Sequence, residues 1–182
     1  MPRFLLTLTI LAGLLTACSP TTTTQTNRTP RPLPGDGGTE RERRMAALIR
    51  GDSQQRRESL VWDERLHRVA QKRAADLGRR AYFAHVDPDG LGPNHHLTQA
   101  GYRLPIKWTA FKSSNQVESI LAGDIDPDKA CERWLKSGKH RRQLLGLNGF
   151  FQAQTRFGVA HARIPGSPFT DYWVYIGAPP ES

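Results

Sequence analysis

Cysteine is scarce in this sequence, and long apolar runs are missing from most of it. The 182 residues include two cysteines, Cys18 and Cys131. Two are too few for a small fold that is cross-linked by several disulfides. Beyond the N-terminus, no apolar run approaches the roughly 18 residues that a membrane-spanning helix needs. Hydrophobic residues still make up 37% of the chain. That content supports one core and argues against a wholly disordered chain.

The N-terminus has the layout of an export signal. Arg3 gives a positive start, residues 4–15 are apolar, and Leu15-Thr16-Ala17-Cys18 follows. This last string resembles the lipobox of bacterial lipoproteins, in which the cysteine becomes the first mature residue and carries lipid. We therefore expect a signal peptide at residues 1–17 and lipidation, including palmitate, at Cys18. The alternative is an ordinary cleaved signal followed by an incidental cysteine.

A tether and one folded domain are expected after the signal. Residues 18–38 are rich in Thr, Pro and Gly and show no hydrophobic periodicity, so they are predicted to link the lipidated cysteine to the domain. The domain is predicted at residues 39–182. Ser19 directly follows the cysteine, and this arrangement resembles lipoproteins sent to the outer membrane. The expected location is therefore the outer membrane, facing the periplasm or the cell surface.

Acidic residues are outnumbered by basic ones. The chain has 17 Asp and Glu against 26 Lys and Arg, a formal net charge of +9. One interpretation is a solvated basic face on a helix, carrying Arg65, Arg68, Lys72, Arg73 and Arg79. The other is attraction to an anionic envelope surface, such as lipopolysaccharide, phospholipid or a cell-wall polymer. Nucleic acid is not an expected partner, because the chain is predicted to be exported and lacks basic motifs interleaved with aromatics.

Helical and strand patterns alternate along the predicted domain. Apolar spacing and capping residues predict helices over 39–57, 63–78, 94–100 and 126–137. Alternation predicts strands over 106–112, 153–162 and 171–177, with the last two forming an antiparallel pair. Cys131 falls on the fourth helix and is expected to be buried. Helices outside and strands inside indicate an α+β fold.

Four motifs in a fixed order point to a family. They lie at Tyr82–Gly90, Asn115–Gly123 and Trp134–Arg141, and at Phe157–Ala160 paired with Tyr172–Val174. Together they resemble the CAP superfamily, also called SCP-like, which contains cysteine-rich secretory proteins, antigen 5 and pathogenesis-related proteins. The resemblance implies an α-β-α sandwich with an antiparallel central sheet flanked by helices.

The resemblance also implies a site. His85 and His140 match the two histidines of the family's cleft, and Glu118 matches its first acidic residue. Ser137 stands where the second acid usually lies, so the site is a reduced one. His85, Glu118 and His140 suit a divalent metal such as zinc or calcium with one position left open. Alternatively, the glutamate orients a histidine as a general base, or the cluster only holds loops together.

Three functions follow from this cluster. The expected one is binding of a lipid, glycan or protein at a groove lined by His85, Glu118, Ser137 and His140. The second is a metal-dependent, peptidase-like hydrolase using the same residues, and the third is a structural interaction module. The chain contains no Gly-x-Ser-x-Gly elbow to supply a serine nucleophile, so binding is expected rather than catalysis.

Overall fold

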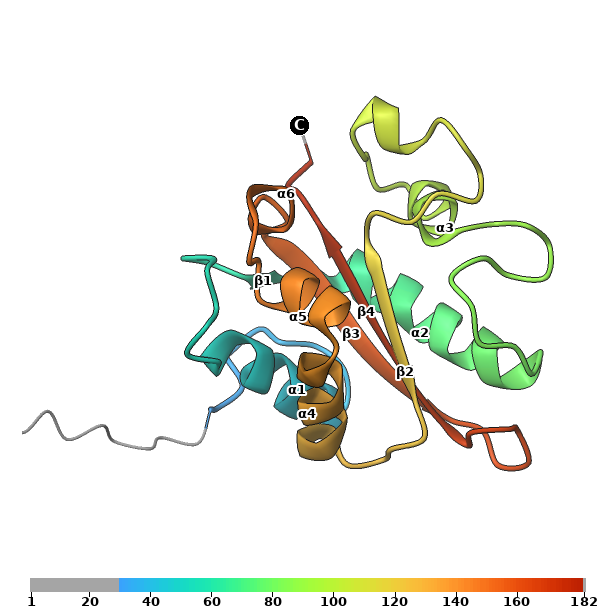
Figure 1. Ribbon diagram of the computed structural model, residues 1–182, viewed down its shortest axis with the longest axis horizontal. Helices are drawn as coiled ribbons and strands as arrows, with labels where there is room; N and C mark the ends of the chain where they lie inside the picture. The colour runs from blue at the N-terminus through green and yellow to red at the C-terminus, as the bar shows by residue number, and fades with distance from the viewer. Residues whose placement is uncertain (1–29, 182) are drawn as a thin grey trace, which may run out of the picture.

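A mixed four-stranded sheet forms the middle layer of the computed structural model, which describes residues 30–181 (Figure 1). The strands are β1 (Val61–Trp62), β2 (Glu118–Ala122), β3 (Arg156–Arg163) and β4 (Asp171–Ala178). The helices are α1 (Glu40–Gly51), α2 (Glu64–Arg79), α3 (Pro93–Gln99), α4 (Pro127–Lys136), α5 (Gly138–Leu144) and α6 (Gly149–Gln152), with a short 3-10 helix η1 (Ile106–Trp108). The predicted signal peptide and Cys18 lie outside the described residues.

The sheet is built around the C-terminal hairpin. Strand order is β1-β3-β4-β2, and β4 pairs antiparallel with both β3 and β2. The antiparallel pair predicted near the C-terminus is therefore confirmed. The two-residue strand β1 adds a parallel pairing with β3 at one edge.

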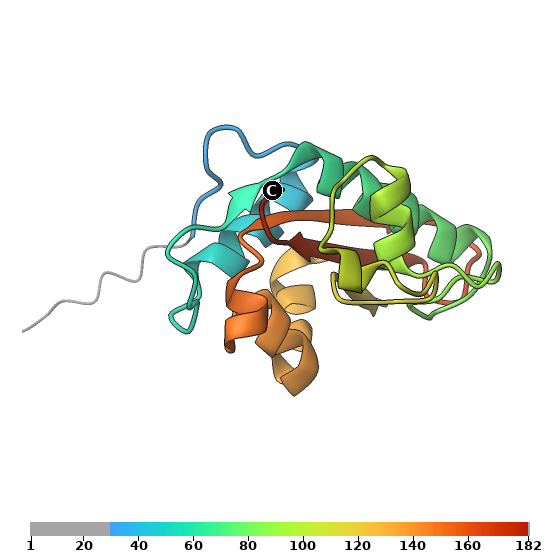
Figure 2. The ribbon, with the colours of Figure 1, turned by 90° about the horizontal axis from the view of Figure 1, so that it is seen from above.

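Helices cover both faces of the sheet, as Figure 2 shows with α2 on one side and α4 and α5 on the other. The first core joins the apolar stripe of α2, including Leu66 and Leu77, to Val174 and Ile176 of β4. The second core joins Met45 of α1 to Trp134 of α4 and to residues of β3 and β4. The predicted α-β-α sandwich is confirmed, because both faces of the sheet are buried under helices.

Capping residues start the two best-predicted helices where the sequence places them. The Asp63 side chain accepts hydrogen bonds from the backbone amides of Arg65 and Leu66 at the start of α2. Asp126 accepts from the backbone amides of Asp128 and Lys129 at the start of α4, where Pro127 occupies the first helical position and has no N–H that would need an acceptor. Cys131 of α4 is a free, buried thiol, as expected, and burial raises its pKa to about 12.

Two sequence-based element predictions were wrong, and strand β2 was not predicted. Residues 106–112 form η1 and turns instead of a strand, because Ile106 and Phe111 are both exposed and pair with no neighbour in a sheet. Strand β2 was missed because all five of its residues are buried, which leaves no alternation to detect. The first helix ends at Gly51 and not at residue 57.

The α4–α5 junction also differs from expectation. Gly138 does not simply end a helix: it begins α5, with Ser137 serving as the last cap of α4 and the first of α5. This second short helix carries His140. Within residues 30–181, no helix combines the length and apolarity required to cross a bilayer.

The end of the predicted tether is docked on the domain. Asp36 forms an ion pair with Arg50 of α1 at 2.5 Å, and the Asp36 side chain is almost fully buried. Arg44 donates to the carbonyl of Pro30 at 2.8 Å. Residues 30–38 are therefore held against α1 through Pro30 and Asp36.

Glu42 of α1 ties three elements together. Its carboxylate accepts hydrogen bonds from the backbone amides of Thr39 at 2.6 Å and His161 of β3 at 2.9 Å, and lies 3.4 Å from His67 of α2. Burial by itself would raise the pKa of Glu42. The contact with His67 and the hydrogen bonds from the amides of Thr39 and His161 outweigh burial and lower the pKa from 4.5 to about 2.

This pKa predicts a specific loss of stability in acid. A carboxylate whose folded pKa is depressed stabilises the fold above the unfolded value of 4.5, and that contribution is lost as pH falls toward 2. Glu42→Gln should therefore be less stable than wild type at pH 7, and the difference should narrow below pH 4.5. Urea unfolding of wild type and Glu42→Gln across this pH range measures the difference in stability. Glu40→Gln, at an exposed position, is the control. A difference independent of pH would contradict the assignment.

Candidate functional site

A buried carboxylate, Glu118, forms the centre of the predicted site. It is the first residue of β2, and its side chain has no exposed surface. Arg73 of α2 forms a two-point ion pair with Glu118. Nε of Arg73 lies 2.8 Å from Oε2 of Glu118, and Nη2 lies 3.2 Å from Oε1. Such two-point contact between guanidinium and carboxylate is both strong and directional. Glu118 is therefore held in one orientation.

Arg73 corrects one sequence-based expectation. It was predicted on the solvated face of its helix, but its side chain is only 2% exposed. The spacing of the apolar residues does indicate that Arg73 is buried, because Arg73 follows Val69 by four residues and precedes Leu77 by four. It therefore lies on the buried stripe of α2 and points at the sheet.

Arg73 also organises the segment that carries the first histidine. Its Nη2 donates to the carbonyl of His85 at 2.9 Å, and its Nη1 donates to the Tyr82 hydroxyl. Tyr82 in turn donates to Asp76 at 2.6 Å. Burial and the hydrogen bond with Asp76 raise the pKa of Tyr82, so its hydroxyl keeps its proton. The loop from Tyr82 to His85 is thus fixed by one buried guanidinium.

His85 is the exposed end of this network. Its Nδ1 lies 3.0 Å from Oε1 of Glu118, and its side chain is 39% exposed. The carboxylate of Glu118, held by Arg73, is the acceptor in this contact, so Nδ1 is assigned as the donor. Among the described residues no partner binds Nε2, so this nitrogen is presented outward. Asn115 supports the arrangement by accepting from the backbone amide of Glu118 at 2.8 Å.

His140 of α5 lies close enough to His85 for the two rings to interact electrostatically. Burial chiefly, and then electrostatic interactions with His85 and Lys139, lower the pKa of His140. Its ring is therefore neutral at pH 7. The Nδ1 atom of His140 is buried and has no hydrogen-bond partner within residues 30–181. The structure thus brings a fixed, half-exposed imidazole and a neutral one into the same region.

Two serines near the site have different surroundings. Ser119, which follows Glu118, is buried and donates to the side chain of Gln143 at 2.6 Å. Ser137 caps α5 by its backbone position, and its side chain makes no capping hydrogen bond. Within the described part of the chain, neither hydroxyl is hydrogen-bonded to His85 or His140. Neither serine is therefore arranged as an activated nucleophile.

The residues fit a metal only in part. Both oxygens of Glu118 are already engaged by Arg73 and His85. Among residues 30–181, no group of three or more His, Cys, Asp or Glu side chains stands close enough together to hold an ion. Zinc or calcium bound here would have the imidazoles of His85 and His140 as ligands, with Glu118 orienting His85 from behind.

The large hollow beside this network lies on the far side of Arg73. It has a volume of about 500 Å³ and is lined by Arg73 but not by His85, Glu118 or His140. The predicted groove around the two histidines is thus distinct from this pocket. Sequence analysis missed Arg73, Tyr82 and Asn115 as supporting residues, because only the tertiary structure shows what their side chains contact.

Comparisons with known proteins agree with the fold. The model of the CAP family, described as the cysteine-rich secretory protein family, matches residues 41–176. An outer surface protein from Borrelia burgdorferi is a similar structure, with 20% identity, a TM-score of 0.51, and coverage of 69% of this chain and 80% of that one. An extracellular protein containing an SCP domain from Bacillus anthracis is also similar, with 20% identity and a TM-score of 0.54. That match covers 77% of this chain but 39% of the Bacillus protein. The comparison with curated proteins finds no match.

Proposed function

The chain belongs to the cysteine-rich secretory protein (CAP) family, and on this premise we propose that it is a ligand-binding protein of the bacterial cell envelope. The ligand is a lipid, a glycan or a protein, held at the surface around His85, Glu118 and His140. The observation that carries the proposal is the clamp on His85, where a wholly buried Glu118 holds one ring nitrogen and leaves the other exposed.

The unfavourable desolvation of the buried Arg73–Glu118 pair supports a role for it beyond stability. Burying an ion pair requires both charges to be desolvated, and apolar side chains of similar volume often stabilise a core as well or better. The Arg73–Glu118 pair nevertheless occupies the interface between α2 and β2. What the pair provides is a fixed direction for the His85 ring. A preoriented polar group beside the neutral His140 suits recognition of a hydrogen-bonding ligand.

Location in the envelope is part of the same proposal. It is supported by the signal and lipobox pattern at residues 1–18, and by two structural neighbours described as an outer surface protein and an extracellular protein. Cys18 would carry the lipid, and the chain before Pro30 would link it to the domain at the outer membrane. Incorporation of labelled palmitate that is lost in Cys18→Ser tests the anchor.

A ligand-retention experiment tests the site. We would incubate the purified full-length protein with lipid and glycan extracts of a Gram-negative envelope and identify what it retains by mass spectrometry. A retained compound should be lost from both His85→Ala and His140→Ala, with circular dichroism unchanged. His95→Ala is the matched control, because it removes a histidine that makes no hydrogen bond within the described chain. Equal retention by all four proteins would contradict binding at this site.

The same variants test the alternatives. Melting curves with ZnCl₂ and CaCl₂ would show metal binding as a rise in Tm, since a ligand at 100 times its Kd stabilises by about 2.7 kcal/mol. A rise that disappears in both site variants would assign the cluster to metal and make hydrolysis of peptides the next assay. Loss of stability without loss of any retained ligand would assign the cluster a structural role.

A further inference from the structure

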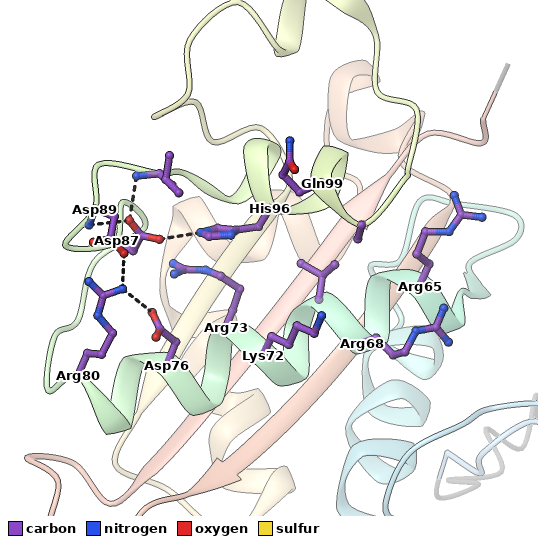
Figure 3. Close-up of a pocket in the computed structure, with 13 residues that line it drawn as sticks. Arg65, Arg68, Lys72, Arg73, Asp76, Arg80, Asp87, Asp89, His96 and Gln99 are labelled. Atoms are coloured by element: carbon purple, nitrogen blue, oxygen red, sulfur yellow. Dashed lines mark hydrogen bonds and ion pairs between the residues drawn. The ribbon is translucent and has the colours of Figure 1, made fainter.

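A second candidate site lies on the outer side of α2. We call it the α2–α3 pocket, and its volume is about 500 Å³ (Figure 3). Its walls are α2, α3 and the loop before α3, which supply Arg65, Arg68, Val69, Lys72, Arg73, Asp76, Arg80, Asp87, Asp89, Leu91, His96, Gln99 and Ala100. This volume is within the range of roughly 300–1,000 Å³ that is typical of small-molecule sites.

Charges in the pocket are segregated along α2. Arg65, Arg68, Lys72, Asp76 and Arg80 recur every three or four residues, so they form one stripe on the helix, and Figure 3 shows them following one another along it. Arg65, Arg68 and Lys72 come first in the sequence, and Asp76 and Arg80 follow them. The acidic members of the lining gather at the other end, where α2 faces the loop before α3.

Side chains at the end with the acidic residues pair with one another. Arg80 lies 2.7 Å from Asp89 and 3.8 Å from Asp76. Across the pocket, His96 of α3 lies 2.9 Å from Asp87, whose side chain is almost fully buried. This end therefore holds three carboxylates, Asp76, Asp87 and Asp89, which can accept hydrogen bonds. Neutral hydroxyl groups suit it better than another anion does.

The other end carries unbalanced positive charge. Lys72 makes no hydrogen bond or ion pair with any residue between 30 and 181. Arg68 has one exposed contact, at 3.8 Å, with Glu64. Arg65 is held by Glu181 at 3.0 Å and by the carbonyl of Gly101. Two cations, Arg68 and Lys72, are thus free to meet an anionic group.

The remaining lining limits the shape of a ligand. Val69, Leu91 and Ala100 are the apolar residues of the pocket, and no aromatic ring lines it apart from the imidazole of His96. A flat apolar molecule would find little surface to stack on. A small polar molecule with one acidic group would place that group at the basic end of the pocket and its hydroxyls at the other end.

We propose that the α2–α3 pocket is a binding site for a small anionic saccharide. Its phosphate or carboxylate meets Arg68 and Lys72, and its hydroxyls lie toward Asp76, Asp89 and Arg80. The site is separate from the His85 surface and shares only Arg73 with it. It also assigns a specific location to part of the basic charge of this helix.

Calorimetric titration of the full-length protein tests the proposal. The anionic probes are trehalose 6-phosphate and a digalacturonic acid, and the controls are trehalose and inorganic phosphate. At least one anionic sugar should bind more tightly than both controls. Lys72→Glu and Arg68→Glu should each weaken that binding roughly ten- to a hundredfold, because each removes a charge-assisted hydrogen bond.

Lys129→Glu provides the matched control. It makes the same charge change at an exposed position on α4, and it should leave binding unchanged. Arg68 and Lys72 are both exposed, so their variants should have the same Tm as wild type. The proposal is overturned if neither sugar binds at millimolar concentration, or if trehalose or inorganic phosphate binds as well as the anionic sugars. It is also overturned if the two pocket variants retain wild-type affinity.

Discussion

Gly158→Ala is expected to lower the free energy of unfolding by at least about 3 kcal/mol. Gly158 of β3 lies where the strand passes directly beneath α2. A Cβ atom added there would stand 2.2 Å from the backbone nitrogen of His67 and 2.5 Å from its Cα. These are main-chain atoms of a helix, so they cannot rotate out of the way. The helix would have to move off the sheet and open the core that it covers.

Urea unfolding of wild type and variant measures this effect. Gly149→Ala is the matched control, because an added Cβ at Gly149 would meet nothing within 4 Å. We expect the control to stay within about 0.5 kcal/mol of wild type. A loss at Gly158 that is no larger than the control's would mean that α2 and β3 are not in such close approach.

Arg73→Met is expected to cost about 3–5 kcal/mol, because it leaves the carboxylate of Glu118 buried without its cation. The methionine fills part of the space but donates no hydrogen bond. The Tyr82 hydroxyl and the carbonyl of His85 lose the same partner. The loop that carries His85 should loosen as well, so ligand retention at the His85 surface should fall together with stability.

A second variant distinguishes the stranded charge from lost packing. Adding Glu118→Gln to Arg73→Met removes the uncompensated charge and should recover part of the lost stability. Arg68→Met is the control on the same helix, and its exposed side chain should matter by less than about 0.5 kcal/mol. Thermal and urea unfolding of wild type, the two single variants and the double variant distinguish the two explanations. No recovery in the double variant would show that packing, and not charge, is what Arg73 supplies.

The site residues divide by how they can be recognised. His85, Glu118 and His140 stand in short motifs whose order along the chain resembles a family, so a single sequence suffices to name them. Arg73 belongs to no such motif. Its place on the apolar stripe of α2 marks it as buried, yet its partner Glu118 is 45 residues away in sequence. Helical periodicity describes which face is buried, but it says nothing about what that face meets.

The strands show the same division. The β3–β4 hairpin is predictable because a turn rich in Pro, Gly and Ser joins two β-rich segments that are adjacent in the chain. By contrast, β1 is two residues long, and β2 is buried on both sides with no alternating pattern. Both exist because the hairpin offers them edges on which to pair. Their assignment depends on residues that are distant in the sequence.

By itself the sequence determined the starts of α2 and α4 and the burial of Cys131, through periodicity and caps. The order of its motifs, through their resemblance to a family, predicted the α-β-α sandwich and named His85, Glu118 and His140 as site candidates. All of these depend on signals that are local in the chain. The tertiary structure alone decided that Arg73 clamps Glu118, that residues 30–38 dock on α1, and that the basic stripe of α2 borders a pocket. Each of these joins side chains that are distant along the chain, and their contact energies exist only after the helices have packed on the sheet.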